Sequence, residues 1–199
     1  MPDTKLYIGF SRSTGGFFSR ALGWLIRRAS GSWVNHAFCL YYDTYAGCWM
    51  TVGANANGVG PIPLDRFQRS RRIVDLWAPA IGSFWDGYHA LHDKIGVPYN
   101  YSGCANMLFV EFARKLGVKD PRNWLSNPAD EFCSEYCAEI VSRSNLPSPA
   151  AAALQETIAL EPPSTIDPGM LRKLFWNSGA MQRYSLASIV GASGLNVGR

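Results

Sequence analysis

The chain has little charge. Of its 199 residues only 17% are charged, whereas 47% are hydrophobic and 13% are aromatic. This composition excludes a disordered chain, a coiled coil and a collagen-like fibre. We expect a globular chain that is long enough for one domain with a sizeable core and too short for two full enzyme domains.

Long apolar runs are also absent. No stretch of about 18 consecutive apolar residues could span a bilayer, and the N-terminal row MPDTKLYIGFSRSTGG contains no basic-then-apolar signal run. We therefore expect a cytoplasmic protein without a transmembrane segment. Any target outside the cytoplasm would have to be reached by lysis, by a phage particle or by a partner, so association with a phage stays open.

The positive charge is modest and scattered. The formal net charge is +4, and the arginines form two small groups, 27–28 and 66–72. A nucleic-acid-binding protein would usually have a denser stripe of basic residues interleaved with aromatic ones, so no nucleic-acid partner is predicted. The second group is interpreted as a solvated turn, and contact with an anionic polymer or membrane surface is the less favoured alternative.

The cysteines do not form a recognisable framework. There are five, an odd number, and no two have the C-x-x-C spacing of a zinc site. We expect every thiol to be free in the folded protein, at positions 39, 48, 104, 133 and 137.

Apolar spacing predicts a mixture of strands and helices. Strands are expected at 6–10, 31–42, 48–54 and 72–77, with the middle two forming a hairpin across a turn of four or five residues. Helices are expected at 17–30, 83–96, 105–116, 151–158 and from position 133 onward. The segment 146–168 should wrap the surface. Residues 1–175 are expected to form the domain and residues 176–199 a loosely held tail.

Cys133 is the candidate nucleophile. The row NPADEFCSEYCAEIV places it at or near a helix start, where unpaired backbone N–H groups stabilise a thiolate and lower the thiol pKa. Cys137 lies one turn deeper and is expected to be an inert core thiol. Position alone leaves an equal alternative for Cys133, that of a small buried apolar residue.

Only three histidines could serve as its base. His89 lies between Asp86 and Asp93, a spacing that favours a solvated face with local ion pairs over a metal site. His92 is interpreted as a boundary residue. His36 begins an apolar strand, which would ordinarily indicate a structural histidine, but a base on a strand that faces a thiol at a helix start is the layout of papain-like sites.

Three sequence motifs, in their order along the chain, resemble those of a known family. They are VNHAFCLYY around His36, GVPYNYSG from 96 to 103, and FCSEYCAEIV from 132 to 141. Together with IDPGMLRKL near the end, they resemble the circularly permuted NlpC-type papain-like hydrolases. The resemblance implies an α+β permuted papain-like fold, with an antiparallel sheet packed against the helix that bears the cysteine. It also implies a tyrosine at the site, Tyr99, although an aromatic that only packs a turn is an equal interpretation.

One element of that family pattern is missing. The polar residue that orients the histidine is often a glutamate on the next strand, and here TVGANANGV has Gly53 in its place. If the residue numbers of each pair in the hairpin add up to 90, Ala54 lies opposite His36. If they add up to 91, Asn55 lies there. Asn55 is the expected orienter, with Asn57 behind it. The alternatives are that both asparagines only shape a turn, or that the protein is catalytically weak or dead.

The resemblance implies a thiol hydrolase of amides or esters that needs no metal or organic cofactor. His36 would take the proton from Cys133 and return it to the leaving group, while the Cys133 N–H and the Tyr99 hydroxyl would stabilise the oxyanion. Cell-wall peptides are the first substrate class, followed by acyl-lipid amides or esters. The alternatives are an acyltransferase or a non-catalytic binding module, such as a phage or surface-assembly component.

Overall fold

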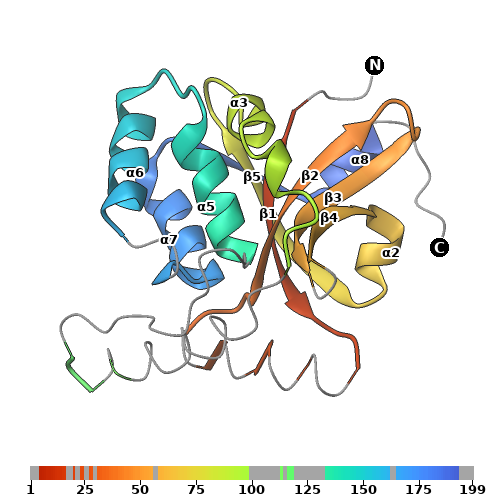
Figure 1. Cartoon of the computed structure of the whole chain (residues 1–199), viewed down its shortest axis with the longest axis horizontal. Helices are drawn as coiled ribbons and strands as arrows, with labels where there is room; N and C mark the ends of the chain where they lie inside the picture. Colours follow the sequence, from red (N-terminus) through yellow and green to blue (C-terminus); the bar gives the residue numbers. More distant parts are fainter. Residues whose placement is uncertain are drawn as a thin grey trace.

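A computed structural model of the chain describes residues 5–16, 20, 23–24, 27–28, 31–55, 58–98, 113, 116–118, 133–161 and 165–192 (Figure 1). Its centre is a six-stranded sheet in the order β4-β3-β2-β1-β5-β6, in which all neighbouring strands are antiparallel. The fold is therefore α+β, as the sequence predicts. The strands are β1 Tyr7–Ser13, β2 His36–Asp43, β3 Cys48–Asn55, β4 Gly58–Pro63, β5 Arg71–Pro79 and β6 Met181–Tyr184.

Helices cover both faces of this sheet. Figure 1 shows α5, α6 and α7 on one side of the strands and α2 and α8 on the other. The described helices are α2 Leu64–Gln68, α3 Trp85–His89, the short 3-10 helix η1 His92–Lys94, α5 Cys133–Arg143, α6 Pro149–Leu160, α7 Pro168–Ser178 and α8 Leu186–Ala192.

The two faces have separate cores. The first core lies between the sheet and α3, α5, α6 and α7, and takes Ala37 and Cys39 from β2. The second core lies between the opposite face and α2 and α8, and takes Phe38 and Leu40 from the same strand. Because side chains alternate along a strand, each residue of β2 belongs to one face only. This division determines which residues can form a site together.

The predicted hairpin is confirmed. β2 and β3 are joined by a turn of residues 44–47, in which the Asp43 carboxylate accepts hydrogen bonds from the N–H groups of Tyr45 and Ala46 at 2.9 and 3.0 Å. Gly47 closes the turn with φ of 63°, a conformation that favours glycine. The predicted strand at 72–77 is confirmed as β5, whereas β4 and α2 were not expected from the sequence.

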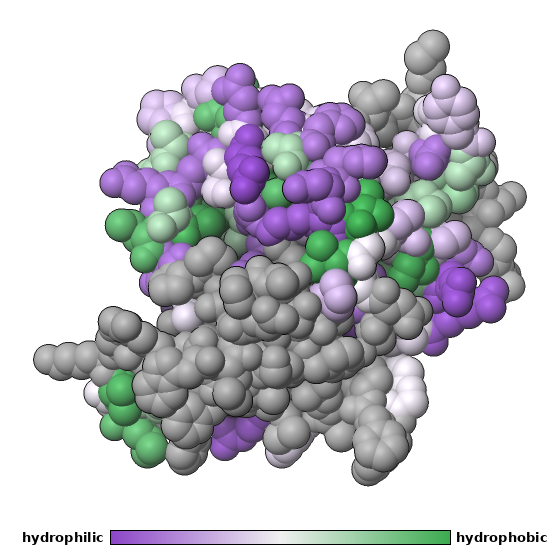
Figure 2. Space-filling view, viewed as in Figure 1, coloured by the Kyte–Doolittle hydropathy of each residue, from purple (hydrophilic) through white to green (hydrophobic). Residues whose placement is uncertain are grey.

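The single helix predicted at 83–96 is two shorter ones. α3 ends at His89, and Leu91 leaves helical geometry with φ of −112° while its side chain is buried in the first core. The burial of Leu91 agrees with the apolar spacing, but the helix does not continue through it. Beyond it, Glu139 of α5 pairs with Lys94 of η1 and with Arg143, and Figure 2 shows a mainly hydrophilic surface over this region.

The expected tail from 176 onward is wrong for residues 176–192. α7 continues to Ser178, β6 pairs with β5 as an edge strand, and α8 buries Ile189 and Val190 in the second core. Small residues were interpreted as a loose segment, but they bring the chain back against the sheet. The helix predicted at 151–158 is confirmed as the longer α6, with Ser148 as its N-cap.

Other expectations fall partly outside the described residues. Within 17–30, the described positions 20, 23–24 and 27–28 are helical, and within 105–116 position 113 is helical. Cys39, Cys48, Cys133 and Cys137 form no disulfide bond, as predicted, while Cys104 lies outside the described residues. No described helix combines the length and apolar character needed to cross a membrane.

Candidate functional site

The predicted nucleophile lies on the first-core side of the sheet. Cys133 is the first residue of α5 that the structure describes, and 4% of its surface is exposed. Cys137, one turn further along, is buried in the first core, as expected for an inert thiol. α5 packs on β2 and β3 from that side, where Ala37 and Cys39 meet it.

The predicted base turns to the other side. His36 is the first residue of β2 and is buried. Its ring stacks on Phe38, with centroids 6.3 Å apart and planes 12° apart, and its centroid lies 5.9 Å from that of Phe67 in α2. Both phenylalanines belong to the second core, so the imidazole faces α2.

The predicted base therefore faces away from the helix that carries the predicted nucleophile. The His36 ring lies on the second-core face of β2, whereas α5, the helix that carries Cys133, packs on the first-core face. The Nε2 atom of His36 has no hydrogen-bond partner among the described residues. The sequence indicated a strand that faces a helix start, but alternation leaves open which of two neighbouring residues faces it. Here Ala37 faces α5, and His36 does not.

Burial controls the protonation of His36. Removal from water lowers its pKa well below the ordinary value, and the positive charge of Arg71 lowers it further. The imidazole is therefore neutral near pH 7. A neutral imidazole has the protonation state of a general base, and the rings of Phe38 and Phe67 lie beside it.

A second polar group lies beside His36. Ser11 of β1 is its direct cross-strand partner and is fully buried. The Oγ atom of Ser11, like Nε2 of His36, has no hydrogen-bond partner among the described residues. Sequence reasoning missed Ser11, although a serine that directly follows the apolar row of the predicted first strand was the available signal.

The β2–β3 register agrees with one of the two predicted alignments, the one that sets Asn55 opposite His36. Every β2–β3 pair sums to 91, as Cys39 with Val52 does, so continuing the ladder sets Asn55 opposite His36 and makes the Ala54 alternative wrong. The Asn55 side-chain amide donates to the Gly53 carbonyl at 2.8 Å, which ties it to its own strand. Asn57 and Tyr99 lie outside the described residues.

Asn55 also borders a cavity. A space of about 460 Å³ opens between β4 and α2, and we call it the β4–α2 groove. The Arg71 guanidinium lies 5.8 Å from the centroid of the Phe67 ring, and Arg66 adds a second positive charge. The lining residues are Asn55, Gly58, Val59, Gly60, Pro61, Ile62, Arg66, Phe67, Ser70 and Arg71.

The remaining histidines, His89 and His92, do not line the β4–α2 groove. His89 is exposed on α3, where its ring stacks on Trp85 with centroids 5.5 Å apart. His92 is exposed on η1. Within the described ranges, no three side chains of His, Cys, Asp or Glu gather closely enough to hold a metal ion.

In comparisons with known proteins, no protein-family model, no curated protein and no solved structure matches this chain.

Proposed function

We propose that this protein is a ligand-binding module whose β4–α2 groove holds a small peptide or amide that carries a carboxylate. The observation that carries the proposal is that the His36 ring and the helix of Cys133 lie on opposite faces of β2. A nucleophilic thiol needs its base within hydrogen-bond reach, and this arrangement separates the two.

The groove has the features of a polar ligand site. Its volume of about 460 Å³ suits a small molecule. The Arg66 guanidinium can form paired hydrogen bonds with a carboxylate, and Arg71 adds a second positive charge to the lining. Phe67, Val59 and Ile62 provide apolar surface beside them. An acidic peptide or amide combines both kinds of contact.

The order of the elements supports a permuted papain-like architecture as part of the proposal. A strand that begins with His36 precedes the helix of Cys133, as in the NlpC-type hydrolases that the sequence resembles. In this proposal the fold and the residue types persist, while the cleft binds and does not cleave.

Binding in the groove is tested by calorimetry with an acetylated and amidated Ala-Glu dipeptide. The matching Ala-Gln dipeptide should bind more weakly, and Arg66→Gln should weaken binding of the acidic dipeptide about tenfold or more, because one charge-assisted contact is lost. Arg69→Gln is the control, since its side chain is 79% exposed and does not line the groove. Equal losses in both variants, or no binding by wild type, would contradict the proposal.

A thiol hydrolase is the second candidate, and one observation favours it. The β2–β3 register, continued by three residues beyond Cys39 and Val52, would set Asn55 opposite His36, which is where an orienting residue belongs. A shift of one residue in β2 would turn His36 towards α5, because such a slip exchanges the two faces of a strand. Catalysis by Cys133 would require a rearrangement of that kind.

Alkylation separates the two candidates. Iodoacetamide labelling across a pH series, with mass mapping of each thiol, is compared between wild type, His36→Ala, His36→Phe and Asn55→Ala. For a binding module, Cys133 should react no faster than the buried Cys39 near neutral pH and should be indifferent to changes at His36. Fast labelling of Cys133 well below pH 8.5, slowed in both His36 variants and less in Asn55→Ala, would support the hydrolase.

A further inference from the structure

A second cavity lies on the opposite side of β5 from the β4–α2 groove. It has a volume of about 280 Å³ and brings together three arginines from three elements: Arg12 of β1, Arg72 of β5 and Arg172 of α7. Arg71 and Arg72 are neighbours on β5 and line different cavities, as alternation along a strand requires. The remaining lining residues are Trp33, Ile73 and Val74.

Two of these arginines are set directly against each other. Arg12 and Arg72 are partners in the β1–β5 ladder, so their side chains leave the same face of the sheet from adjacent positions. Like charges at directly opposed positions destabilise a sheet. Within the described part of the chain neither arginine has an acidic partner.

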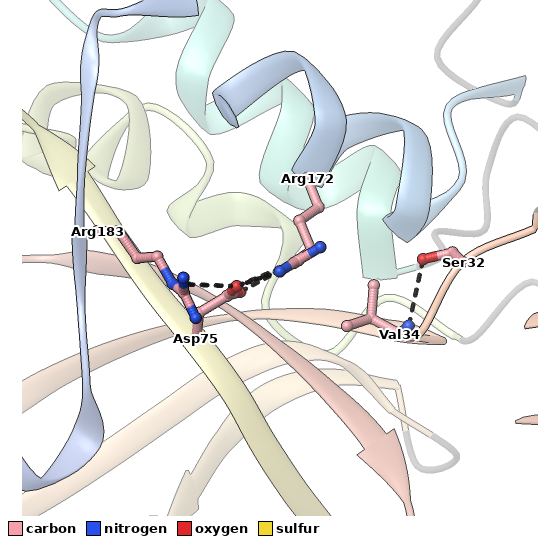
Figure 3. A network of polar contacts seen from close by, with 5 residues as sticks. All are labelled: Ser32, Val34, Asp75, Arg172 and Arg183. Carbon is pink, nitrogen blue, oxygen red and sulfur yellow. Dashed lines mark hydrogen bonds and ion pairs between the residues drawn. The ribbon is translucent and has the colours of Figure 1, made fainter. Parts of the chain in front are cut away.

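The third arginine is held in place by a buried carboxylate. Arg172 donates from Nε and Nη2 to the Asp75 carboxylate at 2.9 and 2.6 Å. The Nε atom of Arg183 forms an ion pair with the same carboxylate at 3.5 Å (Figure 3). One carboxylate thus serves two guanidinium groups. It fixes the direction of Arg172 without balancing the charge of Arg12 and Arg72.

Trp33 is presented at this cavity by an anchored segment. The Val34 N–H donates to the Ser32 hydroxyl at 3.2 Å (Figure 3), and Val34 is buried in the first core. Ser32 lies so close to α7 that a Cβ on Gly169 would come within 2.3 Å of the Ser32 Cβ. The backbone on both sides of Trp33 is therefore held, while 76% of the Trp33 surface is exposed.

We propose that this cavity is a phosphate-binding site, with Trp33 covering the organic group that the phosphate carries. Guanidinium groups match the oxygen geometry of phosphate and bind it through paired, charge-assisted hydrogen bonds. A bound phosphate would offset the repulsion between Arg12 and Arg72. The small volume fits one phosphate group, and the exposed indole offers a flat apolar surface next to it.

The site is tested by thermal unfolding in sodium phosphate, with sodium chloride added to keep the ionic strength constant. Wild type should gain stability with phosphate, since a ligand that binds the native state raises the unfolding temperature. Arg72→Gln should weaken phosphate binding about tenfold. In phosphate-free buffer the same variant should be as stable as wild type or more stable, because the repulsion is relieved.

Arg69→Gln is the matched control, because it removes the same charge outside the cavity. If both variants lose the stabilisation by phosphate equally, that stabilisation is general charge screening and the proposed site is overturned. A phosphate effect that persists in Arg72→Gln would also overturn it. A fall in stability of Arg72→Gln without phosphate would mean that the arginine pair is structural, with the same consequence.

Two further arms identify what carries the phosphate. Phenyl phosphate should bind wild type more tightly than inorganic phosphate, and Trp33→Ala should remove that difference; an unchanged difference would overturn the role of Trp33. Vesicles of phosphatidylglycerol, with phosphatidylcholine as control, distinguish a lipid headgroup from a soluble phosphate compound. If wild type binds neither the phosphate compounds nor the vesicles, the proposal is overturned.

Discussion

At the scale of single residues, His36 connects the stability of the fold to pH. It is buried between aromatic rings, and this burial, helped by the charge of Arg71, keeps its pKa well below the ordinary value of 6.5. In the unfolded chain the same imidazole takes up a proton as the pH falls through about 6.5. Between those two pKa values the unfolded state binds more protons, so acidification favours unfolding.

We therefore expect the free energy of unfolding to fall as the pH is lowered from 7 through 6 towards the folded-state pKa. The contribution of His36 to this slope is at most about 1.4 kcal/mol per pH unit. His36→Phe should lose this part of the slope, because phenylalanine does not titrate and can pack against Phe38 and Phe67. At pH 7 the variant should stay within about 1.5 kcal/mol of wild type.

Urea unfolding at a series of pH values measures this effect. His89→Gln is the control, since His89 is exposed on α3, and it should retain the slope of wild type. A slope in His36→Phe equal to that of wild type would show that His36 is not the group responsible.

At the scale of elements, α3 and α5 approach closely because Gly87 has no side chain. A Cβ added at Gly87 would lie 2.0 Å from the Ile140 carbonyl oxygen and 2.6 Å from the Ser144 hydroxyl. That hydroxyl already donates to the same carbonyl at 2.7 Å, so neither atom is free to move aside. The helices would have to separate.

Gly87→Ala should accordingly destabilise the protein by about 1 to 3 kcal/mol, in the range of overpacked cores. Gly191→Ala in α8 is the matched control, because nothing lies within 4 Å of its added Cβ. That change should be neutral or stabilising by up to about 1 kcal/mol, since alanine favours a helix over glycine. Chemical denaturation of both variants checks the contrast, and a Gly87→Ala as stable as Gly191→Ala would contradict the packing argument.

At the scale of the whole molecule, Asp75 joins three parts of the fold. It lies on the central part of β5, is 1% exposed, and receives Arg172 from α7 and Arg183 from β6. The chain that follows α7 returns to the sheet through this contact and through the β5–β6 ladder. The segment from 176 to 192 is thus held by a buried charge as well as by backbone pairing.

Asp75→Asn should destabilise the protein by about 2 to 3 kcal/mol, because two guanidinium groups lose their buried counter-charge. This loss is smaller than that expected for a fully buried ion pair, because the Arg172 and Arg183 side chains are 25% and 49% exposed and water screens their charges. Asp65→Asn, in an exposed pair with Arg69 at 3.7 Å, should change stability by no more than about 0.5 kcal/mol. Thermal unfolding compares the two, and equal effects would contradict a buried network.

Local pattern was sufficient for the elements whose signals lie close together in the chain. The β2–β3 hairpin follows from alternation on both sides of a turn that Asp43 and Gly47 shape. The α+β class, β5 and the helix of Cys133 follow from apolar periodicity in the same way. In each case, residues within a few positions of one another carry the information.

The placement of the candidate site depends on contacts between distant residues. Alternation says that His36 and Ala37 point to opposite faces, but it does not say which face α5 covers. That choice follows from packing Phe38 and Phe67 together in the second core, across nearly thirty positions of sequence, as the pairing of β6 with β5 follows from residues over a hundred positions apart. Such contacts form only when the whole chain condenses, so a short window of sequence cannot specify them.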